Sequence, residues 1–250
     1  MREILYGVNS VLEALRANRK IKSIYTARGK MDERLRQVVQ TAETRGVKLH
    51  WVDRALLERM AESKSHQGVV AEAESYRYYA VGDILACARD EALAPLLLVL
   101  DGIEDPQNLG AILRTAECMG VHGAVIPKHE ACAVTPAVSR ASAGASEHLK
   151  VARVTNLVQT IKDLKKQGLW VVGTDSQASA SCFDLTYPGP VALVIGGEGR
   201  GIRRLVKESC DYMVHIPMRG QVNSLNASVS CAIVLAEIVK QRWAAATSNG

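Results

Sequence analysis

The sequence contains few aromatic residues and no long apolar run. Aromatic residues make up 4% of the 250 residues, so the chain carries no aromatic stacking code that would identify a nucleotide ligand. The longest apolar stretch, residues 92–100, is interrupted by Pro95 and is far shorter than the roughly 20 residues of a membrane-spanning helix. The first residues place an acid before their apolar side chains and lack the apolar core of a secretory signal. We therefore expect a cytoplasmic protein that does not enter a membrane.

The six cysteines are scattered and no two of them stand in Cys-x-x-Cys spacing. Such scattered cysteines indicate neither a zinc site nor a disulfide framework. We expect reduced, mostly buried thiols and no bound metal.

What the sequence has is ordinary globular composition with a mild basic excess at its N-terminus. Hydrophobic residues make up 48% of the chain, and the formal net charge is +5. Residues 1–75 hold 14 basic against 10 acidic residues, an excess of 4. This excess favours a polyanionic partner such as RNA, contacted through Arg16, Arg19 and Lys20, although a solvated helix face would have the same charges.

Strand and helix patterns divide the chain into two α/β regions. Residues 1–75 alternate short apolar strands with amphipathic helices and predict a small α/β sandwich. Residues 76–93 are expected to be a linker, residues 94–245 a second α/β domain, and residues 246–250 a frayed tail.

Three loops of the second region follow predicted strands at their carboxyl ends, where open α/β sheets place their sites. The first reads Asp-Gly-Ile-Glu-Asp-Pro-Gln-Asn-Leu-Gly-Ala-Ile-Leu-Arg-Thr-Ala from residue 101. In it, Asn108 can cap the next helix, and Arg114 follows about one and a half turns later. A capped helix with a solvated arginine would explain this loop equally well.

The second loop has the sequence Gly-Gly-Glu-Gly-Arg-Gly at residues 196–201, and its glycines let the backbone approach a ligand closely. It matches neither the P-loop nor the dinucleotide-binding fingerprint. The third loop, residues 216–230, contains Ser224 and Asn226, either of which can cap the last helix. Its apolar side chains suit a ligand with a flat apolar ring.

Taken together, the three loops resemble the signature motifs of the SpoU (TrmH) class of SPOUT RNA 2′-O-methyltransferases. The matching patterns are Asp-Gly-x-x-Asp-Pro-x-Asn-Leu-Gly-Ala-x-x-Arg-Thr-Ala, then Gly-Gly-Glu-Gly-x-Gly-Ile, then Ile-Pro-Met-x-Gly-x-Val-x-Ser-Leu-Asn-x-Ser. Residues 135–148 are similar to the family as well. Residues 1–75, with Tyr-Gly-Val-Asn at 6–9 and His-Gln-Gly-Val at 66–69, resemble the L30e-like substrate-binding domain of one subgroup, which acts on a guanosine of 23S rRNA.

The resemblance implies an α/β protein with an N-terminal L30e-like α/β sandwich and a C-terminal SPOUT domain folded into a deep trefoil knot. It implies S-adenosylmethionine as the cofactor, contacted by Gly196, Ile216 and Leu225, with no metal. It also implies a homodimer in which the partner chain completes each site. The family's catalytic residues carry over to Arg114, Asn108, Glu198, Ser224 and Asn226.

The roles of these residues follow from the implied reaction, in which a ribose 2′-hydroxyl must lose its proton as it attacks a methyl group. A guanidinium effectively always holds its proton, so we expect Arg114 to clamp a phosphate and polarise the hydroxyl; a base role would require a desolvated arginine. Asn108 and Asn226 would orient Arg114 and the ribose, and Glu198 would fix Arg114 or the loop. Ser224 would bond a phosphate or the cofactor carboxylate.

Three other interpretations remain at this stage. Within the methyltransferases, the substrate could be a tRNA guanosine instead of 23S rRNA. A second interpretation is a non-catalytic RNA-binding knot protein, which the loss of Arg114 or Asn226 would have indicated. A dehydrogenase with a Rossmann fold is disfavoured, because the glycine loop follows a late strand and lacks the fingerprint.

Overall fold

A computed structural model of the chain describes residues 2–29, 31–90, 93–187 and 189–248. The chain divides into two compact units. The first contains residues 1–77 together with Val134–His148, and the second contains residues 78–133 and 149–250. The chain divides near the predicted linker, residues 76–93, but residues 134–148, which were assigned to the second domain, pack with the first unit. The expected linker also holds a helix, α4 (Val81–Asp90), followed by residues 91–92, which lie outside the described residues.

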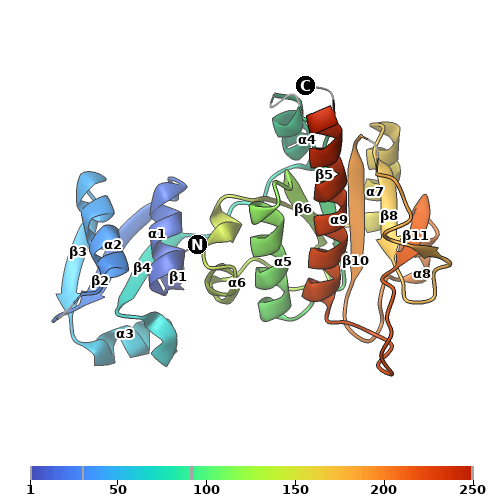
Figure 1. The fold of residues 1–250 in the computed structure, drawn as a ribbon. Coiled ribbons are helices and arrows are strands. Elements are labelled where there is room, and N and C mark those ends of the chain that lie inside the picture. Colours follow the sequence, from blue (N-terminus) through green and yellow to red (C-terminus); the bar gives the residue numbers. More distant parts are fainter. Residues whose placement is uncertain (1, 30, 91–92, 188, 249–250) are drawn as a thin grey trace. The chain divides into compact units, whose positions relative to one another are not determined.

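The first unit is built on a four-stranded mixed sheet in the order β1-β4-β2-β3 (Figure 1). Strand β4 is antiparallel to β1 and β2, while β3 is parallel to β2. Helices α1 and α2 pack on one face of the sheet and α3 on the other, which gives the predicted α/β sandwich. The elements are β1 (Arg2–Tyr6), α1 (Val8–Arg16), β2 (Ile21–Ala27), α2 (Glu33–Thr44), β3 (Lys48–Val52), α3 (Arg54–Ala61), η1 (Lys64–His66) and β4 (Val69–Glu74).

Two short helical elements complete the first unit from a distant part of the sequence. They are α6 (Pro136–Ala141), capped by Thr135, and the 3₁₀ turn η2 (Ala145–Glu147). Both contact α1, and α6 also contacts β1.

The second unit is a seven-stranded parallel sheet in the order β7-β6-β5-β10-β8-β11-β9. Its strands are β5 (Leu96–Asp101), β6 (Gly123–Pro127), β7 (Lys150–Val154), β8 (Trp170–Thr174), β9 (Ala180–Ser181), β10 (Val191–Gly196) and β11 (Tyr212–His215). Its further helices are α5 (Pro106–Cys118), α7 (Leu157–Lys166), α8 (Arg204–Lys207) and α9 (Ala227–Ser248).

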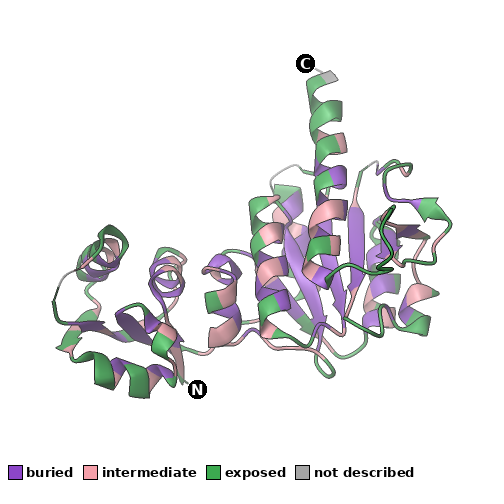
Figure 2. Cartoon of the chain, turned by 60° about the horizontal axis from the view of Figure 1, so that its bottom comes forward, coloured by how far each residue is buried: buried purple, intermediate pink, exposed green. Residues whose placement is uncertain are grey.

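Helices cover both faces of this sheet. Side chains of α4, α7 and α8 form one apolar cluster with alternate residues of β5, β8 and β10, such as Leu97, Val171 and Val194. Helices α5 and α9 contact each other, and α9 also contacts β10. Figure 2 shows the central strands buried between partly exposed helices. Because helices cover both faces of the sheet, its central strands are apolar along nearly their whole length.

The order of the strands places two of the three loops side by side. The chain runs from β5 outward to β6 and β7, then returns so that β10 pairs with β5 on its other side. Such a reversal opens a crevice at the carboxyl ends of the two central strands. The loops after β5 and β10 both end in that crevice.

The last helix is longer than expected. A frayed tail was predicted from residue 246, but α9 continues to Ser248, and residues 249–250 lie outside the described residues. None of the helices in the described part of the chain is long and apolar enough to cross a membrane.

Candidate active site

Three polar side chains, one from each loop, meet at the carboxyl ends of β5 and β10. The amide Nδ2 of Asn226 donates to Oε1 of Glu198 at 2.6 Å and to Oδ1 of Asn108 at 2.9 Å. Asn108 donates to the same Glu198 oxygen at 3.0 Å. One charged oxygen therefore accepts two hydrogen bonds, which are stronger than bonds between neutral groups. The structure thus joins Asn108, Glu198 and Asn226 in one cluster.

The starts of α5 and α9 hold two members of this cluster. Asp105 caps α5 by accepting from the backbone N–H of Gln107 at 3.0 Å, and Pro106 takes the first helical position. The predicted cap at Asn108 is therefore wrong, because the Asp-Pro pair begins the helix three residues earlier and turns Asn108 inward. Asn226 caps α9 by accepting from the backbone N–H of Ser228 at 2.9 Å.

A cavity of about 680 Å³ lies beside the cluster, between the loops that follow β8, β10 and β11. Apolar side chains line one part of it, and backbone amides of the glycine loop and polar side chains line the rest. The residues predicted to bind a cofactor are among those that line it, together with three of the predicted catalytic residues: Gly196, Ile216, Leu225, Glu198, Ser224 and Asn226.

A second cavity, of about 350 Å³, adjoins the first. The two share four residues of the glycine loop: Gly197, Glu198, Arg200 and Gly201. Asn108 lines the second cavity and Asn226 lines the first. The Asn108–Glu198–Asn226 cluster therefore stands between two adjoining cavities.

Two glycines of the loop are required by contacts between backbone segments. A Cβ on Gly196 would lie 2.2 Å from the carbonyl carbon of Gly201, and one on Gly197 would lie 2.0 Å from the carbonyl oxygen of Gly102. Gly197 also donates its N–H to the Asp101 carbonyl at 2.8 Å. The loop after β10 is thereby packed against the loop after β5, which fixes the position of Glu198.

Sequence reasoning missed the ion pair that joins these two loops. The carboxylate of Asp101, at the end of β5, is fully buried and accepts from the backbone N–H of Arg203 at 2.8 Å and from its Nε at 2.7 Å. Arg203 also reaches Glu130 at 3.0 Å. The only signal in the sequence was an acid at the end of the run Leu-Leu-Leu-Val-Leu-Asp.

A second missed pair stands at the edge of the larger cavity. Lys207 of α8 contacts Asp175, which follows β8 and lines that cavity. The hydrogen bond from Lys207 lowers the pKa of the Asp175 carboxyl below its ordinary value. The carboxylate is therefore ionised at neutral pH, with Oδ2 bonded to Lys207 and Oδ1 accepting from the backbone N–H of Gln177.

Arg114 is apart from the cluster. It is exposed on α5 and lines neither cavity, and its side chain has no hydrogen bond or ion pair with another described residue. Within this one chain, the structure therefore does not bring Arg114 to Asn108 or Glu198.

The three basic residues predicted to contact RNA have different surroundings. Arg16 pairs with Glu13 at 2.8 Å and is half exposed, and Lys20 is largely exposed, 3.7 Å from Glu74. Arg19 is different, because its side chain is 9% exposed and pairs with Glu3 at 2.6 Å and Glu147 at 2.7 Å. Arg16 and Lys20 can reach a phosphate, whereas Arg19 is already bound to carboxylates.

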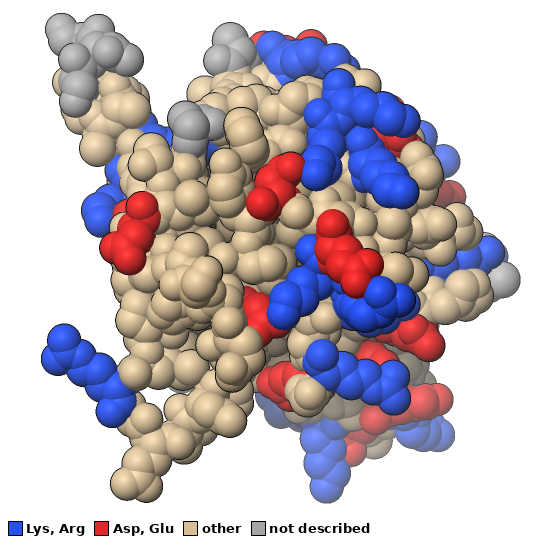
Figure 3. Space-filling view, turned by 90° about the vertical axis from the view of Figure 1, so that its right-hand side faces the viewer, with Lys and Arg blue, Asp and Glu red and all other residues tan. Residues whose placement is uncertain are grey.

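Charge is mixed on the face of the second unit that carries α8 and β11. Figure 3 shows basic and acidic side chains interspersed there, with no broad area of one sign. Across the described ranges, no three His, Cys, Asp or Glu side chains gather in a way that could hold a metal ion.

Two protein families match the chain, one for each region. The SpoU rRNA Methylase family matches residues 95–236, and the RNA 2′-O ribose methyltransferase substrate binding family matches residues 4–79. The first match contains the three loops and both cavities.

Individual relatives match nearly the whole chain. The protein YacO of Bacillus subtilis, assigned to the TrmH family of tRNA/rRNA methyltransferases, is 42% identical over 96% of this chain and 96% of its own length. The 23S rRNA (guanosine-2′-O-)-methyltransferase RlmB of Coxiella burnetii is 41% identical over 98% of this chain and 96% of its own. The crystal structure of the SpoU methyltransferase AviRb from Streptomyces viridochromogenes in complex with AdoMet has a TM-score of 0.81 and 25% identity, covering 97% of this chain and 91% of that one.

Proposed function

The chain belongs to the SpoU rRNA Methylase family of RNA 2′-O ribose methyltransferases, and we propose that it methylates a guanosine of 23S rRNA. The observation that carries this proposal is the Asn108–Glu198–Asn226 cluster between two adjoining cavities. The choice of 23S rRNA is supported by the Coxiella relative, whose name gives that substrate.

The larger cavity suits S-adenosylmethionine, the cofactor bound in the AviRb structure. Ile216, Met218 and Leu225 offer apolar surface to an adenine ring, and the backbone from Gly197 to Gly201 offers hydrogen bonds. Asp175 offers a carboxylate to the ammonium group. When bound, the cofactor supplies a methyl group on a sulfonium.

The second cavity would receive the target ribose. Glu198 and Asn108 line it, so an amide and a carboxylate lie where a 2′-hydroxyl can donate or accept a hydrogen bond. Asn226 holds Glu198 in place and keeps one of its oxygens occupied. The second Glu198 oxygen is left to orient the hydroxyl, and Ser224 on the other side would bond a phosphate or the cofactor carboxylate.

Arg114 would act in the site of a second copy of the chain. It is exposed and apart from its own cluster, so a homodimer would supply a surface against which α5 can place it. Exposed apolar side chains in and before α9 support such an interface: Val222, Leu225, Val229 and Trp243. In the partner's site, its planar fork would clamp the phosphate beside the target ribose and polarise the hydroxyl.

The first unit would bind the RNA. Arg16 and Lys20 remain candidates for phosphate contacts, while Arg19 is bound to Glu3 and Glu147. The trefoil knot of the second unit stays a prediction, since the sheet order alone does not trace the chain through its loops.

The test is methylation of unmodified transcripts by the full chain, with S-adenosylmethionine labelled on its methyl group. We expect label on the 2′-oxygen of a guanosine in 23S rRNA and none in tRNA transcripts. Label in tRNA would contradict the choice of substrate. No transfer to either RNA, by a chain that binds S-adenosylhomocysteine, would favour the non-catalytic RNA-binding protein.

A further inference from the structure

Residues 134–148 lie inside the region that the SpoU rRNA Methylase family covers, yet they pack with the substrate-binding unit. The chain leaves the second unit after Ala133 and returns to it at Leu149, one residue before β7 begins. The two units are therefore joined by three peptide connections. Two of these connections frame this segment, which we call the insert (residues 134–148).

The insert is docked closely against α1. A Cβ on Gly144 would lie 2.6 Å from Cβ of Glu13 and 2.9 Å from the carbonyl oxygen of Asn9, so only glycine allows this approach. Four of its residues with small or branched side chains are almost fully buried: Val138, Ser139, Ser142 and Ser146. Such packing leaves no solvent layer between the insert and α1.

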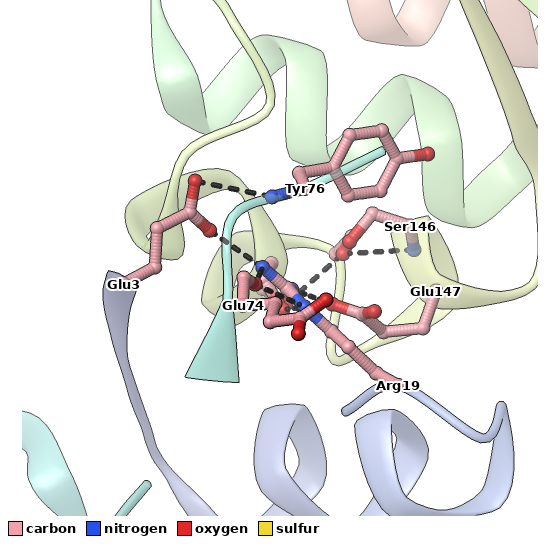
Figure 4. Close-up of polar contacts among 8 residues, drawn as sticks. Glu3, Arg19, Glu74, Tyr76, Ser146 and Glu147 are labelled. Carbon is pink, nitrogen blue, oxygen red and sulfur yellow. Dashed lines mark hydrogen bonds and ion pairs between the residues drawn. The ribbon is translucent and has the colours of Figure 1, made fainter. Parts of the chain in front are cut away.

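A buried ion pair also holds the C-terminal end of the insert (Figure 4). Arg19 donates through Nη1 to Oε1 of Glu147 at 2.7 Å, and the two side chains are 9% and 4% exposed. Ser139 donates to the same Glu147 oxygen at 3.3 Å. Glu147 is therefore bound both to the insert itself and to a residue 128 positions away.

Arg19 also ties the insert to the sheet of the first unit. It donates to Oε2 of Glu3 on β1 at 2.6 Å and to the carbonyl oxygen of Glu74 at the end of β4 at 2.7 Å. Its guanidinium lies 5.9 Å from the centre of the Tyr76 ring. Because the guanidinium fork is planar and rigid, these bonds fix the direction from which Glu147 can approach.

This arrangement is a costly way to gain stability alone. Burial raises the pKa of the Glu147 carboxyl, and the Arg19 guanidinium opposes that rise. Apolar side chains of similar volume often stabilise a fold as well as a buried ion pair does, but they specify the geometry of a contact less strictly. The Arg19–Glu147 pair is therefore suited to fixing the position of the insert on the first unit.

We propose that Arg19 and Glu147 are positioning residues for methyl transfer, which latch the insert onto the substrate-binding unit so that the unit holding the RNA is tethered directly to strands β6 and β7. This proposal rests on the proposed function. The insert is joined covalently to both strands, since it follows β6 and precedes β7. The sheet continues from these strands to β5, which the Asn108 loop follows.

The experiment compares Glu147→Gln with the full wild-type chain. Glutamine has nearly the same shape but no charge, and Arg19 keeps Glu3 and the Glu74 carbonyl as partners, so the variant should fold. We expect amides of residues 134–148 to exchange with solvent about tenfold faster. At saturating 23S rRNA transcript, kcat should fall about tenfold while KM for the RNA changes less than about threefold. The affinity for S-adenosylhomocysteine should stay within about twofold.

The matched control is Glu13→Gln. Glu13 pairs with His148 at 2.8 Å, so this change also removes a contact between α1 and the insert region, but a more exposed one. In this variant, the amide exchange of residues 134–148, kcat and KM for the RNA should stay within about twofold of wild type.

Two results would contradict the proposed role of the Arg19–Glu147 pair. Unchanged exchange in Glu147→Gln would show that the pair does not hold the insert. Faster exchange with unchanged kcat would show that the pair is only structural. A wild-type chain that methylates neither 23S rRNA nor tRNA would instead contradict the proposed function, and exchange alone would then decide whether the pair holds the insert.

Discussion

The side-chain amide of Asn226 donates to Oε1 of Glu198 at 2.6 Å, and this bond joins the start of the last helix to the glycine loop. The same Asn226 caps α9 through its carbonyl oxygen. Asn226 therefore has two separable roles: its side-chain carbonyl oxygen caps the helix, and its side-chain N–H group binds Glu198.

Replacing Asn226 with aspartate should separate these tasks. Aspartate can still cap α9, but it places a second carboxylate against Glu198, and two like charges at this distance repel. We expect methyl transfer to fall by about a hundredfold or more, with a melting temperature close to that of wild type. Single-turnover kinetics and thermal unfolding measure the two effects. A variant that loses stability but transfers methyl groups normally would contradict the role given to the donor.

Arg114→Ala should abolish methyl transfer and leave the affinity for S-adenosylhomocysteine nearly unchanged, since Arg114 lines neither cavity. Arg114→Lys should recover little, because a point charge cannot reproduce the guanidinium fork. If Arg114 acts in the partner's site, mixing Arg114→Ala with Asn226→Asp chains restores one intact site per mixed dimer. Random mixing then gives about a quarter of wild-type activity. Mixtures as inactive as their components would place Arg114 in its own chain's site or outside catalysis.

The glycine loop gives a test of the cofactor cavity. Gly196→Ala would place a Cβ 2.2 Å from the Gly201 carbonyl carbon, so the glycine loop, including Glu198, must shift. Calorimetry on the full chain should show the affinity for S-adenosylhomocysteine reduced at least about tenfold. Gly220→Ala is the matched control, because a Cβ there meets no atom within 4 Å. Equal affinities in the two variants would show that this loop does not shape the cofactor site.

The thiols should differ widely in reactivity. Burial raises the pKa of Cys231 to about 12, and Cys210 is raised to about 12 for the same reason. A raised pKa favours the protonated thiol, so at about pH 8 only about one such group in ten thousand is a reactive thiolate. Iodoacetamide should label the exposed Cys118 first and Cys231 last. Peptide mass spectrometry gives the order, and unfolded protein, in which all six should react, is the control.

Much of the second unit could be predicted from its sequence, because local patterns determine it. The apolar run at residues 96–100 is typical of a buried strand, and β5 is Leu96–Asp101. The three loops were expected at strand ends, and the crevice between β5 and β10 brings Asn108 and Glu198 together.

What could not be predicted depends on partners far away in the chain. The charge of Arg19 indicated an RNA contact, because a sequence does not show whether a phosphate or a carboxylate neutralises a cation. Its carboxylate, Glu147, lies 128 positions away in a segment whose pattern resembled the methyltransferase domain. The Asp101–Arg203 pair was missed for the same reason, since the two residues are 102 positions apart.

The three peptide connections between the units also constrain how this protein can evolve. A domain joined by a single linker can be exchanged by one recombination event within that linker. Here, an exchange of residues 1–77 alone would separate Arg19 from Glu147 and replace the α1 surface on which Gly144 rests. A new RNA-binding module would therefore need a matching insert to keep the Arg19–Glu147 pair and the close contact at Gly144.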